Sequence, residues 1–219
     1  MRQTIKSKKI YFISFSIFIF TGLFLLALFT KEEIFLFVNR NNSTFLDYVF
    51  RYGTYLGKGS IYAILIIVTL FMKYRYTLAT CLAAIVETTL VQVPKKILFP
   101  DMVRPIKYFA DFPNLHIVDN VKIYSHYTFP SGHTAVAFCV FTLLAIFIDK
   151  KHLEIPFLFL ALFVGYSRIY LVQHFFLDVY FGAIIGVFSA LFSLWLVNIR
   201  QFPPMANWGW LDNGLGKNR

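Results

Sequence analysis

Charged residues are scarce in this 219-residue chain, and cysteine is almost absent. Only 15% of the residues are charged, whereas 58% are hydrophobic and 20% are aromatic, and the mean hydropathy is +0.64. An ordinary soluble domain is excluded, because such domains carry about 25% charged residues. The composition therefore predicts a polytopic membrane protein.

The two cysteines, Cys81 and Cys139, both fall within apolar runs. Neither a disulfide framework nor a thiolate zinc site is expected from them, since both need several cysteines at suitable spacing. The sequence also has no cluster of carboxylates with the spacing of a two-metal site. No internal repeat is evident.

Basic residues outnumber acidic ones by 21 to 11, which gives a net charge of +10. In a soluble chain this excess would indicate nucleic acid as a partner. Here the bases lie largely between hydrophobic runs, where membrane orientation and anionic lipid headgroups account for them. We therefore expect the bilayer as a partner, and no nucleic acid.

Hydrophobic segments of this kind predict an all-α fold, a polytopic helical bundle with six transmembrane helices and short interfacial helices. The predicted spans are residues 10–29, 54–72, 77–93, 133–148, 155–172 and 175–197, the third ending at Pro94. The interfacial helices are expected within residues 31–58, and an interfacial tail at residues 200–219, where Trp208 and Trp210 sit at the headgroup level. Residues 1–219 thus form a single membrane-embedded domain.

The first span is preceded by four bases, Arg2, Lys6, Lys8 and Lys9, and has no clear cleavage site after it. We interpret it as an uncleaved span whose basic start lies in the cytoplasm. Counting six spans places both termini in the cytoplasm. Residues 31–58, 95–128 and 168–178 then lie on the other face of what we expect to be the cytoplasmic (inner) membrane.

Arg168, His174 and Asp178 lie in an otherwise apolar stretch, where each needs a partner or a function. His174 and Asp178 are four residues apart, so on a helix the carboxylate could accept the imidazole N–H and leave the other nitrogen free to attack. Arg168 lies about 9 Å of helical rise before His174, so a bend is needed to bring both to one anion. Alone, the pattern is more typical of a satisfied core histidine.

The tetrapeptide Pro130-Ser-Gly-His133 directly precedes the fourth span. A helix that begins there offers Ser131 and free backbone N–H groups to an anion, with Gly132 allowing close approach. His133 could supply a proton to a leaving oxygen. On its own, the tetrapeptide is more typical of a plain helix cap with a histidine at the headgroup level.

Lys96 and Arg104 add two cations in the same outer stretch, and Pro105 fixes the backbone after the arginine. Arginine binds phosphate oxygens in a bidentate way, while lysine acts as a point charge. Such residues are most often solvated loop bases when they occur singly. The third span also contains Glu87, for which we favour a structural partner role over a site.

Together these motifs resemble the tripartite signature of the type 2 phosphatidic acid phosphatase family, which shares its site with the vanadium haloperoxidases. That signature reads Lys-x6-Arg-Pro, Pro-Ser-Gly-His and Ser-Arg-x5-His-x3-Asp. The second and third motifs are complete, at residues 130–133 and 167–178. The first departs from the pattern, because seven residues separate Lys96 from Arg104 and eight separate Lys95 from it. Lys96 is taken as the nearer match.

The resemblance implies an integral membrane lipid phosphatase. In that mechanism His174 attacks phosphorus to form a phosphohistidine, Asp178 holds His174, and His133 protonates the leaving group. The implied phosphate-binding groups are Lys96, Arg104, Ser131, Gly132 and Arg168. The resemblance implies neither a metal nor another cofactor, because cations already surround the phosphate. Candidate substrates are a polyprenyl diphosphate, lipid A, phosphatidate and phosphatidylglycerophosphate.

Three alternatives remain at this point. A phosphotransferase could use the same site with an acceptor, and a haloperoxidase could hold vanadate there, although haloperoxidases are mainly soluble. A transporter or channel could line a path with Arg168, His174, Asp178 and Glu87. That last reading predicts polar residues throughout the membrane depth, whereas all of these except Glu87 lie at one set of span ends.

Overall fold

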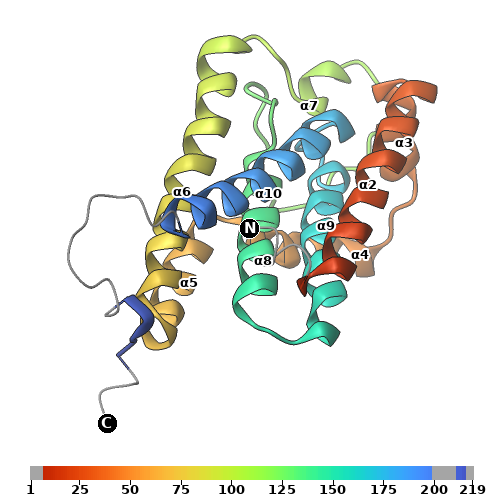
Figure 1. The fold of residues 1–219 in the computed structure, drawn as a ribbon. Helices are drawn as coiled ribbons and strands as arrows, with labels where there is room; N and C mark the ends of the chain where they lie inside the picture. Colours follow the sequence, from red (N-terminus) through yellow and green to blue (C-terminus); the bar gives the residue numbers. More distant parts are fainter. Residues whose placement is uncertain (1–6, 199–210, 216–219) are drawn as a thin grey trace.

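The computed structural model describes residues 7–198 and 211–215, which form a bundle of helices (Figure 1). No strand occurs among the described residues, and the only β-type pairing there is an isolated bridge between Val103 and His126. The nearly all-helical fold confirms the predicted class. Arg2, Lys6, Trp208 and Trp210 lie outside the described residues.

The helices follow one another along the chain with short connections, apart from the long stretch between residues 99 and 131. They are α2 (Lys9–Leu28), α3 (Lys31–Arg40), α4 (Thr44–Gly53), η1 (Thr54–Gly57), α5 (Ser60–Met72), α6 (Tyr74–Val93), η2 (Pro94–Leu98), α7 (Pro105–Tyr108), α8 (Gly132–Phe147), η3 (Lys151–Leu153), α9 (Glu154–Tyr170) and α10 (Phe176–Asn198).

Four helical segments in the described part of the chain are long and apolar enough to cross a membrane. They are Lys9–Leu28, Tyr74–Leu98, Lys151–Tyr170 and Phe176–Asn198. A fifth span arises if Thr44–Gly57 and Ser60–Met72, which are bent by 57° relative to each other, count as one. Residues 54–72, predicted as one span, are therefore divided between η1 and α5. The apolar helix α8 is shorter, at 16 residues.

The third predicted span does not end at Pro94. Proline lacks the N–H for the regular helical bond and its ring crowds the preceding turn, so the helix widens there into a π turn, η2. The Phe99 N–H closes this turn by donating to the Pro94 carbonyl at 2.8 Å. The helix consequently continues through Lys95 and Lys96, which project from different sides of it.

The core is centred on α8, which lies between α6 and α9 and packs against α10 (Figure 1). Most of its side chains are buried. Gly182 of α10 allows a close approach to the start of α8, since a Cβ there would lie 2.6 Å from the Ser131 carbonyl oxygen. This contact holds the first turn of α8 beside the first turn of α10, where Asp178 lies.

Candidate functional site

His174 and Asp178 form a buried pair, each 2% exposed. Asp178 lies in the first turn of α10, whereas His174 lies in the loop of residues 171–175 before it. His174 Nδ1 is 3.3 Å from Asp178 Oδ2, and the Phe175 N–H donates to the same oxygen at 3.0 Å. The carboxylate thus favours a proton on Nδ1 and leaves Nε2 as the free nitrogen.

Thr128 is a third member of this group that the sequence analysis missed. Its hydroxyl donates to Asp178 Oδ2 and lies 3.3 Å from His174 Nδ1. Thr128 comes from the long outer stretch and is 3% exposed. Its position two residues before Pro130 was the only signal in the sequence. The threonine ties that stretch to the histidine and aspartate.

The loop between α9 and α10 supplies the bend that Arg168 and His174 require. The N–H groups of Gln173 and His174 both donate to the Arg168 carbonyl, at 3.0 and 3.1 Å. Val172, just before them, is fully buried with φ 58°, in a region that β-branched residues rarely adopt. This turn reverses the chain so that His174 returns beside the end of α9.

Arg168 is 6% exposed and has few partners. Its Nη1 donates to Thr54 Oγ1 of η1 at 2.6 Å, while its Nε is buried without a hydrogen-bond partner. A guanidinium carries five N–H donors, and most of those of Arg168 have no acceptor in the described parts of the protein. Because an unpaired buried donor is unfavourable, the geometry fits a bound anion.

Arg104 is more fully engaged than Arg168. Its Nε donates to the His126 carbonyl at 2.9 Å, and its Nη2 to the Tyr127 carbonyl at 3.4 Å. Its Nη1 contacts both the carbonyl and the Oε1 of Gln173, at 3.2 and 3.0 Å. Burial lowers the pKa of Arg104, and Asp178 acts in the opposite direction. Arg104 therefore contributes its charge and one remaining N–H.

The first turn of α8 also offers donors. The Ser131 N–H donates to the Asp178 carbonyl at 3.0 Å, and its hydroxyl pairs with Thr134 Oγ1 at 2.9 Å. The backbone N–H groups of Gly132 and His133 have no acceptor among the described residues. Of the predicted cradle, the backbone at Gly132 and His133 is thus open to an anion, whereas Ser131 is occupied.

The two candidate lysines are placed differently. Lys96 is exposed, whereas Lys95 is half-buried and lies close enough to Arg104, Arg168 and Asp178 for their charges to interact. The choice of Lys96 made from the motif spacing does not fit this arrangement. Both lysines lie in the π turn, and Lys95 is the one whose side chain faces the cationic group.

Glu87 lies on α6, 3% exposed, and its charge interacts with that of Lys95. Thr88 Oγ1 donates to its carboxylate at 3.5 Å. The expectation that Glu87 acts as a structural partner of a base stays a prediction.

Burial and the neighbouring charges together determine the ionisation of His174. Burial lowers its pKa well below the usual value, and Arg104, Lys95, Arg168 and His133 act in the same direction. The imidazole is therefore neutral at physiological pH and keeps a lone pair on Nε2. No group of three or more histidine, cysteine or acidic side chains that could hold a metal ion occurs in the described part of the chain.

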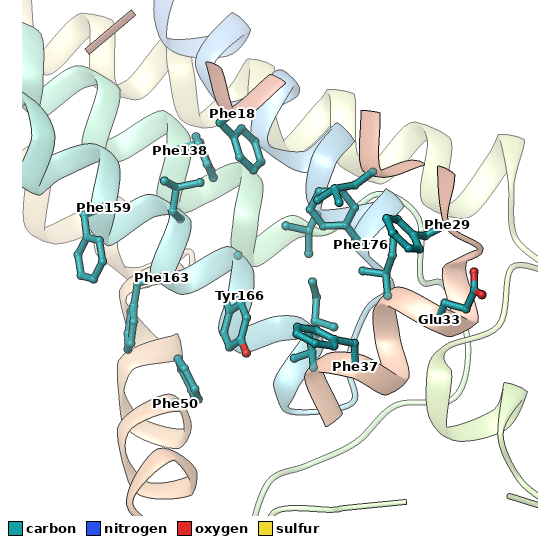
Figure 2. A pocket seen from close by; sticks show the side chains of 17 residues that line it. Phe18, Phe29, Glu33, Phe37, Phe50, Phe138, Phe159, Phe163, Tyr166 and Phe176 are labelled. Atoms are coloured by element: carbon teal, nitrogen blue, oxygen red, sulfur yellow. The ribbon is translucent and has the colours of Figure 1, made fainter. Parts of the chain in front are cut away.

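An apolar cavity of about 960 Å³ is lined by residues of α2, α3, α4, α8, α9 and α10 (Figure 2). Its wall is mainly aromatic, and Glu33 at one end is its only acidic lining residue. None of the candidate site residues lines it. The cavity is therefore separate from the cationic group around His174.

Comparison with known proteins identifies the fold and the class of site. The sequence matches the PAP2 superfamily over residues 61–202. It is 41% identical over 92 residues to the bacitracin transport permease protein BcrC of Bacillus licheniformis, an alignment that covers 40% of this chain and 41% of that protein. The chain thus matches about two fifths of the length of this curated relative.

Two solved structures resemble most of the bundle. The crystal structure of Aquifex aeolicus LpxE superposes with a TM-score of 0.65 at 31% identity, covering 74% of this chain and 93% of that one. The PAP2-type phosphatidylglycerolphosphate phosphatase from Bacillus subtilis superposes with a TM-score of 0.60 at 28% identity, covering 87% and 98% of the two chains.

Proposed function

The chain belongs to the PAP2 superfamily, and from that premise we propose that it is an integral membrane lipid phosphatase, which hydrolyses a phosphate monoester or diphosphate of a membrane lipid. One observation carries the proposal. Three buried or half-buried cations, Lys95, Arg104 and Arg168, surround a neutral histidine together with a single carboxylate, Asp178. One carboxylate does not balance three cations, and a bound phosphate would offset the remaining positive charge.

In the proposed reaction, His174 Nε2 attacks phosphorus while the bond from phosphorus to the leaving oxygen breaks. His133, which must be protonated at this step, gives that oxygen its proton, so that an alcohol or a phosphate departs and His133 is left neutral. His133 then takes a proton from water as the water oxygen attacks the phosphohistidine, which releases phosphate and restores both histidines. Asp178 and Thr128 hold the Nδ1 side of His174 throughout.

The phosphate oxygens are bound in this proposal by Arg168, the Gly132 and His133 N–H groups, the remaining N–H of Arg104, and a lysine. We propose Lys95 for that role in place of Lys96, because its charge reaches Arg104 and Arg168. Phosphoryl transfer depends mainly on positioning and electrostatic stabilisation, which these donors would provide without a metal.

We further propose that α8 and the bent pair of α4 and α5 also cross the bilayer, which gives six spans. With the basic start of the chain in the cytoplasm, both termini then lie there, and the phosphate site faces the opposite side of the membrane. A site at the bilayer surface suits a lipid, since the tail can stay in the membrane while the headgroup enters.

The substrate is proposed from four candidates, namely a polyprenyl diphosphate, lipid A, phosphatidate and phosphatidylglycerophosphate. The Bacillus subtilis neighbour is a phosphatase of the last of these. The word permease in the name of the BcrC relative keeps the transporter reading in view. A transporter would move its ligand without releasing phosphate, so catalysis distinguishes the two.

The deciding experiment measures phosphate release by the purified, detergent-solubilised protein with EDTA, across the four lipids. We expect one lipid to be turned over well above the others, and His174→Ala to be folded and inactive. His116→Ala is a matched control, because His116 Nε2 pairs with Asp47 Oδ1 at 2.8 Å outside the site. Silence of the folded wild type, loss of turnover with EDTA, or normal turnover by His174→Ala would contradict the proposal.

A further inference from the structure

We propose that Gln173 is a positioning residue, which holds the Arg104 guanidinium beside the nucleophile and thereby sets the affinity of the site for phosphate. The inference rests on the phosphoryl-transfer function proposed above. Gln173 directly precedes His174 in the 171–175 loop and is 1% exposed. It occupies one of the unspecified positions of the third sequence motif.

The amide of Gln173 has one orientation that satisfies its surroundings. Its Oε1 accepts a hydrogen bond from Arg104 Nη1 at 3.0 Å, while its Nε2 donates to the Lys122 carbonyl at 3.1 Å. The reversed amide would set an NH₂ group against the guanidinium and an oxygen against a carbonyl, so that neither contact could form. Gln173 therefore connects Arg104, the outer stretch and the nucleophile loop.

Gln173 is also the only side chain that accepts a hydrogen bond from Arg104 in the described parts of the chain. The other acceptors are backbone carbonyls, those of His126 and Tyr127 on one side and that of Gln173 itself on the other. The guanidinium is thus clamped between two segments that come together only in the folded protein. Its direction depends on Gln173 at the end nearest His174.

This clamp has a consequence for the reaction because Gln173 and His174 are neighbours. The same short turn, whose N–H groups donate to the Arg168 carbonyl, fixes the positions of both the nucleophile His174 and the side chain that holds Arg104. A charge that stabilises a transferring phosphoryl group acts only if it is held at the right place beforehand. A leucine at position 173 would preserve the volume but leave one Arg104 N–H without its acceptor, so that only backbone carbonyls would still hold the guanidinium in position.

The test is a double-mutant cycle on the full-length protein in detergent, read out by the dissociation constant for inorganic phosphate. Gln173→Leu should weaken phosphate binding by roughly 10- to 100-fold, the range for loss of a hydrogen bond to a charged group. In an Arg104→Lys background, where the guanidinium is already absent, the same change should weaken binding by no more than about twofold. Equal losses in both backgrounds would overturn the proposal.

Asn39→Leu is the matched control. Asn39 is also a buried amide, 2% exposed, and it exchanges hydrogen bonds of 2.8 and 3.0 Å with the backbone of His116 in the same outer stretch. Its loss should lower thermal stability without changing phosphate affinity. If the control lowered affinity as much as Gln173→Leu does, the effect of Gln173 would be one of general stability and the proposal would be wrong.

Gln173→Glu covers the case in which the leucine variant fails to fold. The carboxylate keeps an acceptor for Arg104 but neutralises its charge, so phosphate affinity should fall while the fold is kept. Unchanged affinity in this variant would reject the role of Gln173. The readout of this test is binding, so its failure can be told apart from failure of the proposed function. A wild type that binds phosphate but releases none from any lipid would contradict only the proposed hydrolysis. A wild type that turns over lipid but shows no coupling between Gln173 and Arg104 would contradict only the inference.

Discussion

Buried cations occur at both ends of α8, but their partners differ. Where α8 ends, Lys8 is 2% exposed and donates to Asp149 Oδ1 at 2.9 Å and to the Ile148 carbonyl at 3.4 Å. Where α8 begins, Arg168 is equally enclosed, yet its only hydrogen-bond acceptor in the described residues is the hydroxyl of Thr54. The first cation is neutralised within the protein and fastens α2 to the bundle, whereas the second has no acidic partner within 4 Å in the described residues.

The largest effect that tests this contrast is expected from Arg168→Met. Loss of a donor aimed at the transferring phosphate should lower kcat/KM by about 10³-fold. Thermal stability should stay the same or rise, because a buried charge without an acidic partner is removed. Phosphate release and thermal unfolding of the same preparation would check both. A large fall in melting temperature would mean that Arg168 is a structural cation like Lys8.

The next effect separates the two lysines of the π turn. Lys95→Met should lower kcat/KM by roughly 10- to 100-fold, since a charge near the phosphate is lost. Lys96→Met, one residue away and exposed, should stay within about twofold. Steady-state phosphate release provides the comparison. The reverse order of effects would restore Lys96 as the phosphate-binding lysine.

At the other end of α8, Lys8→Met should affect stability alone. The methionine keeps the buried stem but loses both hydrogen bonds, so the melting temperature should fall by about 2–4 °C. Turnover per folded molecule should be unchanged. A lower kcat in this variant would show that the two ends of α8 are coupled, contrary to the distinction drawn above.

The smallest effect is expected from pH. The pKa of His174 is lowered by burial and by the surrounding cations, so the imidazole stays neutral between pH 7 and 6. At the opposite end, the Lys8 hydrogen bond lowers the pKa of Asp149, which stays ionised in the same range. Neither His174 nor Asp149 changes charge in this range, so the titration of these two groups should alter kcat/KM by no more than about twofold. A titration of the His174 ring centred near pH 6.5, followed by NMR, would assign His174 an ordinary pKa.

The lowered pKa of His174 also makes the stability of the fold depend on pH. Below about pH 6.5 the unfolded chain protonates His174 while the folded protein does not, so lowering the pH through this range should destabilise the fold. Above it both states are neutral and the contribution vanishes. His174→Gln, which removes the titrating ring, should reduce this pH dependence of the melting temperature.

Hydropathy was sufficient to predict the helical class. An apolar run in a membrane must satisfy its backbone hydrogen bonds internally, which a helix does whatever its neighbours are. His174 and Asp178 were predictable from the sequence for a related reason, since their spacing is local. The π turn at Pro94 was not predictable, and both Lys95 and Lys96 lie in it. Proline signals an interruption without saying whether a helix stops or widens.

Thr54, Thr128 and Gln173 could not be found from the sequence. Each acts through a residue far away in the chain, Thr54 through Arg168, Thr128 through Asp178 and Gln173 through Arg104. Hydroxyl and amide side chains are common, and only tertiary packing selects these three. The left-handed conformation of Val172 is similar, because no local preference of valine would predict it.

The length of α8 has a consequence for the surrounding membrane. Its 16 residues span about 24 Å, which is less than the roughly 30 Å of a hydrocarbon layer. In the six-span arrangement proposed above, with the far end of α8 at one interface, Gly132 and His133 would lie several ångströms below the other, at a depth that headgroups normally do not reach. Either the bilayer thins around this helix or the headgroup sinks to meet it. The thickness of the bilayer thus contributes to the free energy with which a lipid substrate enters the site.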